Sequence, residues 1–135
     1  MNIVITLPLP LIQAIMEGRK TYEMRKAIPK HLKVGEDGFF CVEKGSKRVL
    51  CWCRVDKFLI LNPFKKVDSY LVDNLCVSAD WITQYREGSA FKDIKLWKIG
   101  KVISFKEPLL IDKDLLVDRA PQSFAYTTLS YGESY

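Results

Sequence analysis

The apolar residues near the start of the chain fall into two successive patterns. A β-branched run at positions 2–7 predicts a strand, and the prolines that follow, Pro8 and Pro10, end it. Since proline suits the first turn of a helix, the next apolar residues are expected to line one face of a helix. These residues are Leu11, Ile12, Ile15 and Met16. Gly18 stands where such a helix would end in a left-handed residue.

Two later hydrophobic stretches predict a β-hairpin. Residues 39–43 and 48–60 are rich in β-branched and aromatic residues, and they flank a short polar turn that contains Gly45. The second arm is long enough to bend, and this favours a small barrel over a flat sheet. The Asn62-Pro63 pair ends it.

Helical patterns follow at 66–75 and 79–87. Ser78 is a candidate N-cap of the second helix, and Gly88 is expected to stop it. Trp81, Ile82 and Tyr85 form its apolar stripe. Asp80 would lie in the first turn, where a carboxylate stabilises the positive end of the helix.

The chain then returns to the sheet. Residues 94–102 predict a strand, and 108–111 a further short strand. The remaining segment, 112–135, shows little periodicity. We expect one barrel domain at 1–111 and a C-terminal extension at 112–135 that packs on it, with the final residues, from Ser130, loosely held.

The size and composition are those of an ordinary globular domain. The chain has 135 residues, of which 48% are hydrophobic and 27% charged, enough for one core. It begins without a cationic leader, and no apolar run reaches the ~18 residues that a membrane span needs. We therefore expect a cytoplasmic protein without membrane contact.

Positive charge is concentrated in the first half of the chain. Residues 1–66 contain thirteen Lys/Arg and six Asp/Glu, whereas residues 67–135 contain eight Lys/Arg and ten Asp/Glu. The net charges are therefore +7 and −2. Such asymmetry is typical of a protein with a polyanionic partner such as RNA or DNA.

The cysteines and the single histidine show no metal-ligand spacing. Cys51 and Cys53 are separated by one residue rather than two, and His31 has no second histidine nearby. In the predicted strand the two thiols share a face with Val49 and Val55. We expect reduced structural thiols, no metal and no cofactor.

A dense group of charges follows the first helix. Lys20, Glu23, Arg25 and Lys26 come directly after an apolar segment, where a buried core would contain none of them. They either form a site or lie solvated along an edge strand. Strict alternation separates Lys20 from Glu23, unless the chain bulges after Gly18.

This stretch resembles a known family signature. Gly18-x-Lys20-x-x-Glu23-x-Arg25 matches the GxKxxExR motif of the ASCH domain family, within the PUA-like superfamily. The order of predicted elements around the motif is also similar to that family, and the resemblance covers about residues 3–111. It implies an α+β fold, a small and mostly antiparallel β-barrel with helices packed around it, and a cleft beside the first helix.

The resemblance further implies binding of RNA or single-stranded nucleic acid, or of a nucleoside moiety. Phosphate contacts would come from the basic side chains near the motif and in the hairpin turn. Glu23 would orient Arg25 or accept a hydrogen bond from the amino group of a base. The candidate ligand-binding residues are Lys20, Glu23, Arg25, Lys26, Lys47 and Arg48.

Two enzymatic alternatives come from the same resemblance. Some members resemble amidohydrolases of acylated cytidines such as N4-acetylcytidine, with a lysine at the position of Lys20, a threonine where this chain has Glu23, and a helical glutamate for which Asp80 is the nearest carboxylate. Thr21 offers another hydroxyl. The second alternative is a metal-independent ribonuclease, in which Lys20 and Arg25 stabilise phosphorane charge and Glu23 or Asp80 acts as base.

Overall fold

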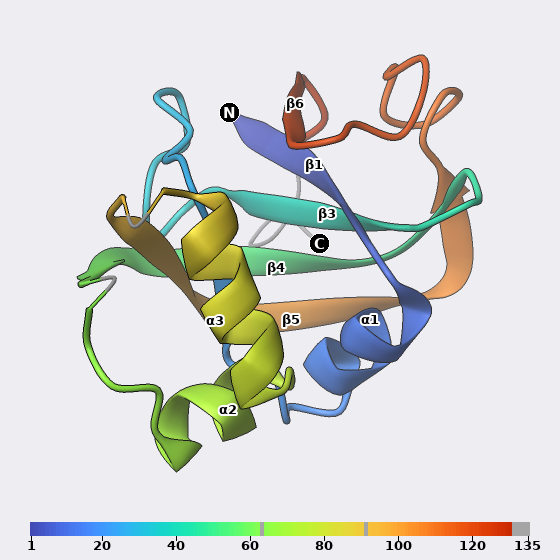
Figure 1. Ribbon diagram of the computed structural model, residues 1–135. Helices are drawn as coiled ribbons and strands as arrows, with labels where there is room; N and C mark the ends of the chain where they lie inside the picture. Colours follow the sequence, from blue (N-terminus) through green and yellow to red (C-terminus); the bar gives the residue numbers. More distant parts are fainter. Residues whose placement is uncertain (63, 91, 131–135) are drawn as a thin grey trace.

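The computed structural model describes residues 1–62, 64–90 and 92–130, which form a mixed six-stranded sheet and three helices (Figure 1). The strand order is β2-β5-β4-β3-β1-β6. Only the β1–β3 pair is parallel among the strand pairs of these residues. The strands are β1 (Asn2–Leu7), β2 (Tyr22–Arg25), β3 (Gly38–Glu43), β4 (Arg48–Leu61), β5 (Ile94–Leu110) and β6 (Phe124–Thr127). The helices are α1 (Leu9–Met16), α2 (Ser69–Leu75) and α3 (Ala79–Gly88).

The sheet is not closed into the barrel that the sequence predicts. Closure would require the two edge strands, β2 and β6, to pair with each other. Instead β2 is only four residues long and pairs with β5, whereas β6 adds to the outer side of β1. The predicted bend is present, because the ladder between β4 and β5 contains three register shifts. It curves an open sheet, so the α+β class is confirmed and the barrel is wrong.

The first elements follow the predicted pattern closely. The helix α1 begins one residue before Pro10, and its buried side chains include Ile12 and Ile15. Gly18 has a positive φ of 78°, as a residue that ends a helix in the left-handed region requires. The chain can therefore turn sharply from α1 towards β2.

Side-chain caps set the start of both later helices. Asp68 accepts a hydrogen bond from the backbone nitrogen of Leu71 at 3.0 Å, and Ser78 accepts one from Trp81 at 3.1 Å. The predicted N-cap at Ser78 is thus confirmed. Gly88, which was expected to follow α3, is its last residue.

The strand β5 is longer than the sequence predicts. It runs without interruption through residues expected to form two separate strands, and Figure 1 shows it bending upward at its far end. Pro108 lies between Ser104 and Leu109, in the stretch where the register with β4 shifts. A proline is tolerated there because it does not have to donate a ladder hydrogen bond.

The C-terminal extension contributes a strand to the sheet. The strand β6 pairs antiparallel with β1, and the side chains of Phe124 and Tyr126 pack against the core. The final residues were predicted to be loosely held from Ser130 onward, and of these positions 131–135 lie outside the described residues. None of the described helices is long and apolar enough to cross a membrane.

One glycine permits a close approach between β3 and β4. A Cβ atom at Gly38 would lie 1.8 Å from the carbonyl oxygen of Cys53, so that backbone would have to move. We predict that Gly38→Ala lowers the free energy of unfolding by about 2–3 kcal/mol, measured by urea denaturation. Gly88→Ala is the control, because its Cβ meets no atom within 4 Å. It should leave stability unchanged or raise it by up to about 1 kcal/mol; equal stability of both variants would contradict the prediction.

Candidate functional site

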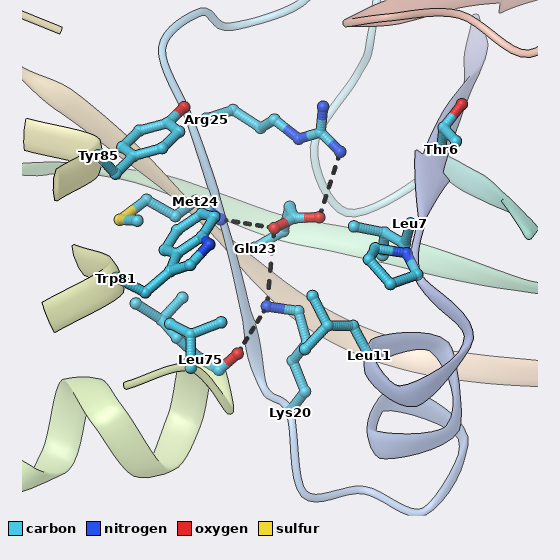
Figure 2. A pocket seen from close by; sticks show the side chains of 12 residues that line it. Thr6, Leu7, Leu11, Lys20, Glu23, Met24, Arg25, Leu75, Trp81 and Tyr85 are labelled. Atoms are coloured by element: carbon cyan, nitrogen blue, oxygen red, sulfur yellow. Dashed lines mark hydrogen bonds and ion pairs between the residues drawn. The ribbon is translucent and has the colours of Figure 1, made fainter. Parts of the chain in front are cut away.

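A cavity of about 270 Å³ opens beside the first helix, between β2 and the helices α2 and α3 (Figure 2). Three members of the charged motif line it, together with apolar and aromatic side chains. The lining residues are Thr6, Leu7, Pro8, Leu11, Lys20, Glu23, Met24, Arg25, Leu75, Val77, Trp81 and Tyr85. The structure therefore brings Lys20, Glu23 and Arg25 together at one concave surface.

The Lys20 ammonium group is almost fully buried, with 3% of the residue exposed. Its Nζ donates to the carbonyl oxygens of Tyr22 at 2.7 Å and Leu75 at 3.0 Å. The same atom lies 3.6 Å from Oε1 of Glu23. One cation therefore joins the start of β2, the end of α2 and the motif carboxylate.

The backbone after α1 places Lys20 in this position. The amide nitrogens of Arg19 and Lys20 both donate to the carbonyl oxygen of Ala14, at 2.9 and 3.1 Å. Because one carbonyl group accepts from two successive amides, the chain stays close to the end of α1 before β2 begins. Lys20 precedes β2, so the alternation of side chains along that strand does not apply to it. Its side chain can therefore reach Glu23, a point that the sequence left undecided.

Glu23 is held on both sides. Its Oε1 accepts a hydrogen bond from the amide nitrogen of Met24 at 2.9 Å, and its Oε2 lies 3.4 Å from Nη2 of Arg25. Arg25 also donates through Nη1 to the carbonyl oxygen of Ser123 at 3.1 Å. The buried carboxylate is thus flanked by two cations, and it faces the cavity in a defined orientation (Figure 2).

Two aromatic rings form a wall of the cavity. Trp81 and Tyr85 lie one turn apart on α3, with centroids 5.3 Å apart and an interplanar angle of 17°. Trp81 is 45% exposed, whereas Ile82 of the same predicted stripe is fully buried in the core. Burial raises the pKa of the Tyr85 hydroxyl, against a lowering effect of Arg25. The sequence pattern assigned both rings to the packed face of the helix. Only part of that apolar face packs against the core, and the pattern did not show that the two rings would line the cavity.

A second hollow of about 290 Å³ shares Arg25 and Tyr85 with the first. It is lined by Arg25, Lys26, Ala27, Tyr85, Gln122 and Ser123. Nζ of Lys26 lies 5.5 Å from the centroid of the Tyr85 ring. The site is therefore continued by a basic surface to which the C-terminal extension contributes, a contribution that no motif in the sequence indicates.

Two predicted phosphate ligands lie elsewhere. Lys47 pairs with Asp112 at 2.8 Å, and Arg48 lies 3.8 Å from Glu43, both at the β3–β4 turn. The hydrogen bond between Lys47 and Asp112 raises the pKa of Lys47 and lowers that of Asp112. Neither Lys47 nor Arg48 lines either hollow.

The residues considered for amide hydrolysis do not meet. Thr21 donates its hydroxyl hydrogen to the side-chain oxygen of Asn74, and Asp80 is exposed in the first turn of α3. Both are absent from the residues that line the cavity. Of the three proposed catalytic positions, only those of Lys20 and Glu23 share the pocket.

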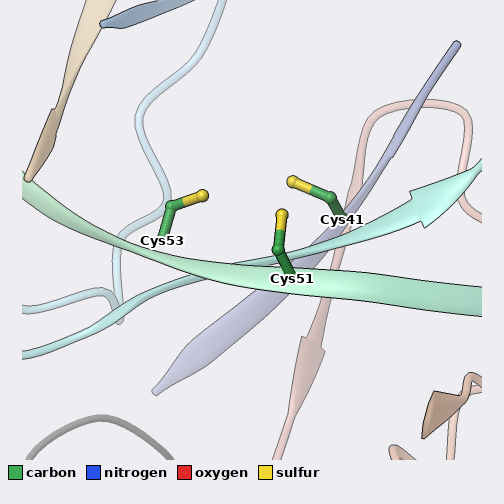
Figure 3. Close-up of side chains that lie close together, drawn as sticks. All are labelled: Cys41, Cys51 and Cys53. Atoms are coloured by element: carbon green, nitrogen blue, oxygen red, sulfur yellow. The ribbon is translucent and has the colours of Figure 1, made fainter. Parts of the chain in front are cut away.

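Sequence spacing missed a cluster of three thiols. Cys41 on β3 joins Cys51 and Cys53 on β4, and all three are fully buried (Figure 3). Hydrogen bonds from Cys41 and Cys53 lower the pKa of Cys51 to about 5, while burial raises the pKa values of Cys41 and Cys53. The predicted burial of Cys51 and Cys53 on one strand face is confirmed. Residue spacing along one strand does not indicate this cluster, because Cys41 meets Cys51 and Cys53 only across the pairing of β3 with β4.

Comparison with known proteins relates the chain to ASCH structures. No protein-family model and no curated protein matches it. The structure of ASCH from Zymomonas mobilis superposes with a TM-score of 0.74 at 18% identity, over 93% of this chain and 86% of that chain. A serine-to-alanine variant of that protein gives a TM-score of 0.71 at 17% identity, covering 93% and 87%. EF3133 from Enterococcus faecalis gives 0.52 at 18%, covering 70% and 68%.

The chain therefore has the fold of ASCH domain proteins. At this identity the superposition establishes the fold alone.

The geometry predicts that Lys20 and Glu23 depend on each other. Lys20→Met leaves a buried carboxylate and two carbonyl groups without their cation, and it should lower the free energy of unfolding by about 3–5 kcal/mol. The double variant Lys20→Met/Glu23→Gln should lose less than the sum of the single variants, with a coupling of about 1–3 kcal/mol by denaturant unfolding.

Arg19→Met is the matched control for this cycle. Arg19 is exposed and pairs with Glu17 at the surface, so its loss should not change stability measurably. Additive single effects in the cycle would contradict the interdependence of Lys20 and Glu23.

Proposed function

We propose that this protein binds a single-stranded RNA or nucleic-acid segment, with one base inserted in the cavity and the adjoining phosphate on Arg25 and Lys26. The observation that carries the proposal is Glu23, a buried carboxylate held in place by two cations and facing a cavity with aromatic walls. Convergence of a few fixed polar groups in an apolar pocket is typical of a ligand site.

The size of the cavity favours one nucleoside unit. Pockets for drug-sized ligands measure about 300–1,000 Å³, and this cavity of 270 Å³ lies just below that range. The partly exposed ring of Trp81 offers a face on which a base can stack. Such stacking contributes about 1–3 kcal/mol per base in proteins that bind single strands.

Glu23 supports recognition of an amino group on the base. A carboxylate has about four lone-pair positions, and the hydrogen bonds from Met24 and Arg25 account for two of them, with the Lys20 ammonium 3.6 Å from Oε1. A remaining position can accept from the exocyclic amine of cytosine, adenine or guanine. Uracil presents no such donor, so the site is expected to discriminate against it.

The second hollow supports a phosphate contact. Arg25 and Lys26 line this hollow beside Gln122 and Ser123 of the extension, and both belong to the half of the sequence that has a net positive charge. Lys20 does not serve this role, because its three N–H groups all face acceptors of the protein.

Binding has more support than hydrolysis in this geometry. An ammonium group whose hydrogens all face acceptors has no lone pair for nucleophilic attack or proton abstraction. The carboxylate of Asp80 is not at the cavity to share proton transfer with Glu23. Lys20 is accordingly proposed to position Glu23.

Tryptophan fluorescence tests occupancy of the cavity. Trp52 and Trp97 are buried, so ligand-dependent quenching should come from Trp81. We expect cytidine or a short cytidine-rich RNA to quench emission in a saturable manner, with no quenching in Trp81→Phe. Saturable quenching of equal size in Trp81→Phe would place the ligand elsewhere.

Motif variants test recognition and charge. Glu23→Gln should weaken binding of cytidine-rich RNA by about 1–3 kcal/mol and improve binding of uridine-rich RNA relative to it, because an amide can donate to the uracil carbonyl. Arg25→Ala and Lys26→Ala should each reduce the slope of log affinity against log salt by about 0.7. Affinities are measured by fluorescence anisotropy over a salt series, after thermal unfolding has shown that each variant is folded.

Lys47→Ala and Arg48→Ala provide matched charge controls. Each removes one positive charge from the hairpin turn outside both hollows, and neither should change the affinity or the salt slope comparably. Absence of binding to all RNAs, or equal losses in the motif and hairpin variants, would refute the proposed site.

A further inference from the structure

The three buried thiols on β3 and β4 lie together in space. Cys41 and Cys51 are register partners across the two strands, and Cys53 follows on the same face of β4. Their side chains converge on one point (Figure 3), and the three Sγ atoms all lie within 4.8 Å of one another. Cys76, the fourth cysteine, is partly exposed and lies outside the cluster.

This spacing suits three sulfur ligands around one metal ion. With metal–sulfur bonds of about 2.3 Å, a trigonal planar site places its sulfur atoms about 4.0 Å apart. The three Sγ atoms all lie within 4.8 Å of one another, on two strands whose ladder holds these positions side by side.

The chemistry of the donors favours a soft monovalent ion. Thiols select Cu(I) or zinc over harder cations, and structural zinc takes four ligands. Within the part of the chain that the structure describes, three sulfur donors come together here, and the surrounding core is apolar, with Ile3, Ile5 and Phe39 among its members. Cu(I) is satisfied by three sulfur ligands, so it matches the number of donors present.

We propose that Cys41, Cys51 and Cys53 form a closed trigonal site for Cu(I). Each cysteine binds as the thiolate, and the protons of the thiols are released to solvent as the three sulfur–copper bonds form. No electron is transferred. The monovalent cation offsets part of the negative charge that the thiolates bring into the core.

Copper loading during refolding tests this site. The full chain with Cys76→Ser is unfolded without oxygen in a non-thiol reductant, mixed with one equivalent of Cu(I) and refolded. It is then challenged with the Cu(I) chelator bicinchoninate. Refolding gives the ion access to positions that are fully buried in the folded protein. We expect one copper per chain by elemental analysis.

Substitution of the cluster identifies the ligands. Cys51→Ala, made in the Cys76→Ser background, should lower Cu(I) affinity at least 100-fold, since loss of even an outer-shell partner can cost 10–100-fold. Cys41→Ala and Cys53→Ala repeat the measurement at the other two positions. Circular dichroism without metal identifies the variants that fold, and every folded variant should show this loss, while the chelator challenge of the Cys76→Ser protein tests the site without any cluster substitution.

Three outcomes would overturn the proposal. The Cys76→Ser protein could lose all copper to the chelator, a folded cluster variant could retain copper as tightly as that protein, or zinc could be held more tightly than Cu(I). Because the cluster lies outside the cavity lining, none of these results depends on whether the chain binds RNA.

Discussion

The buried Lys20 ammonium is the interaction on which the site depends. It donates to carbonyl oxygens at the start of β2 and the end of α2, and it lies beside Glu23. A buried cation is stable only when acceptors surround it, so these three segments must keep their positions together. The motif lysine thereby couples the packing of α2 to the orientation of the carboxylate that faces the cavity.

In this arrangement one motif residue stabilises the protein, and two others are placed to contact a ligand. Lys20 is committed to protein acceptors, whereas Glu23 retains acceptor capacity and Arg25 reaches towards the second hollow. A rigid carboxylate beside aromatic walls is better suited to recognising a base than to moving protons without a partner. The ASCH fold provides the frame for this surface, and the residues of this chain decide what it can recognise.

Curvature of the open sheet also determines the surroundings of the site. The bent ladder between β4 and β5 supports β2, while β6 holds the C-terminal extension against β1. Through that extension, the carbonyl group of Ser123 reaches Arg25. The pairing of β3 with β4 that organises the core also brings three thiols together. The register of these two strands therefore produces a cysteine cluster that is separate from the charged motif.

The sequence by itself determined most of the elements, because hydrophobic periodicity, prolines and caps act over a few residues. It predicted β1, the hairpin, the Ser78 cap and a dense group of charges that includes Lys20, Glu23 and Arg25. Only the tertiary structure decided that the sheet stays open, that Trp81 faces the cavity, that Asp80 and Lys47 lie outside it, and that Cys41 meets Cys51 and Cys53. These outcomes depend on contacts between residues distant in sequence, which local patterns do not encode.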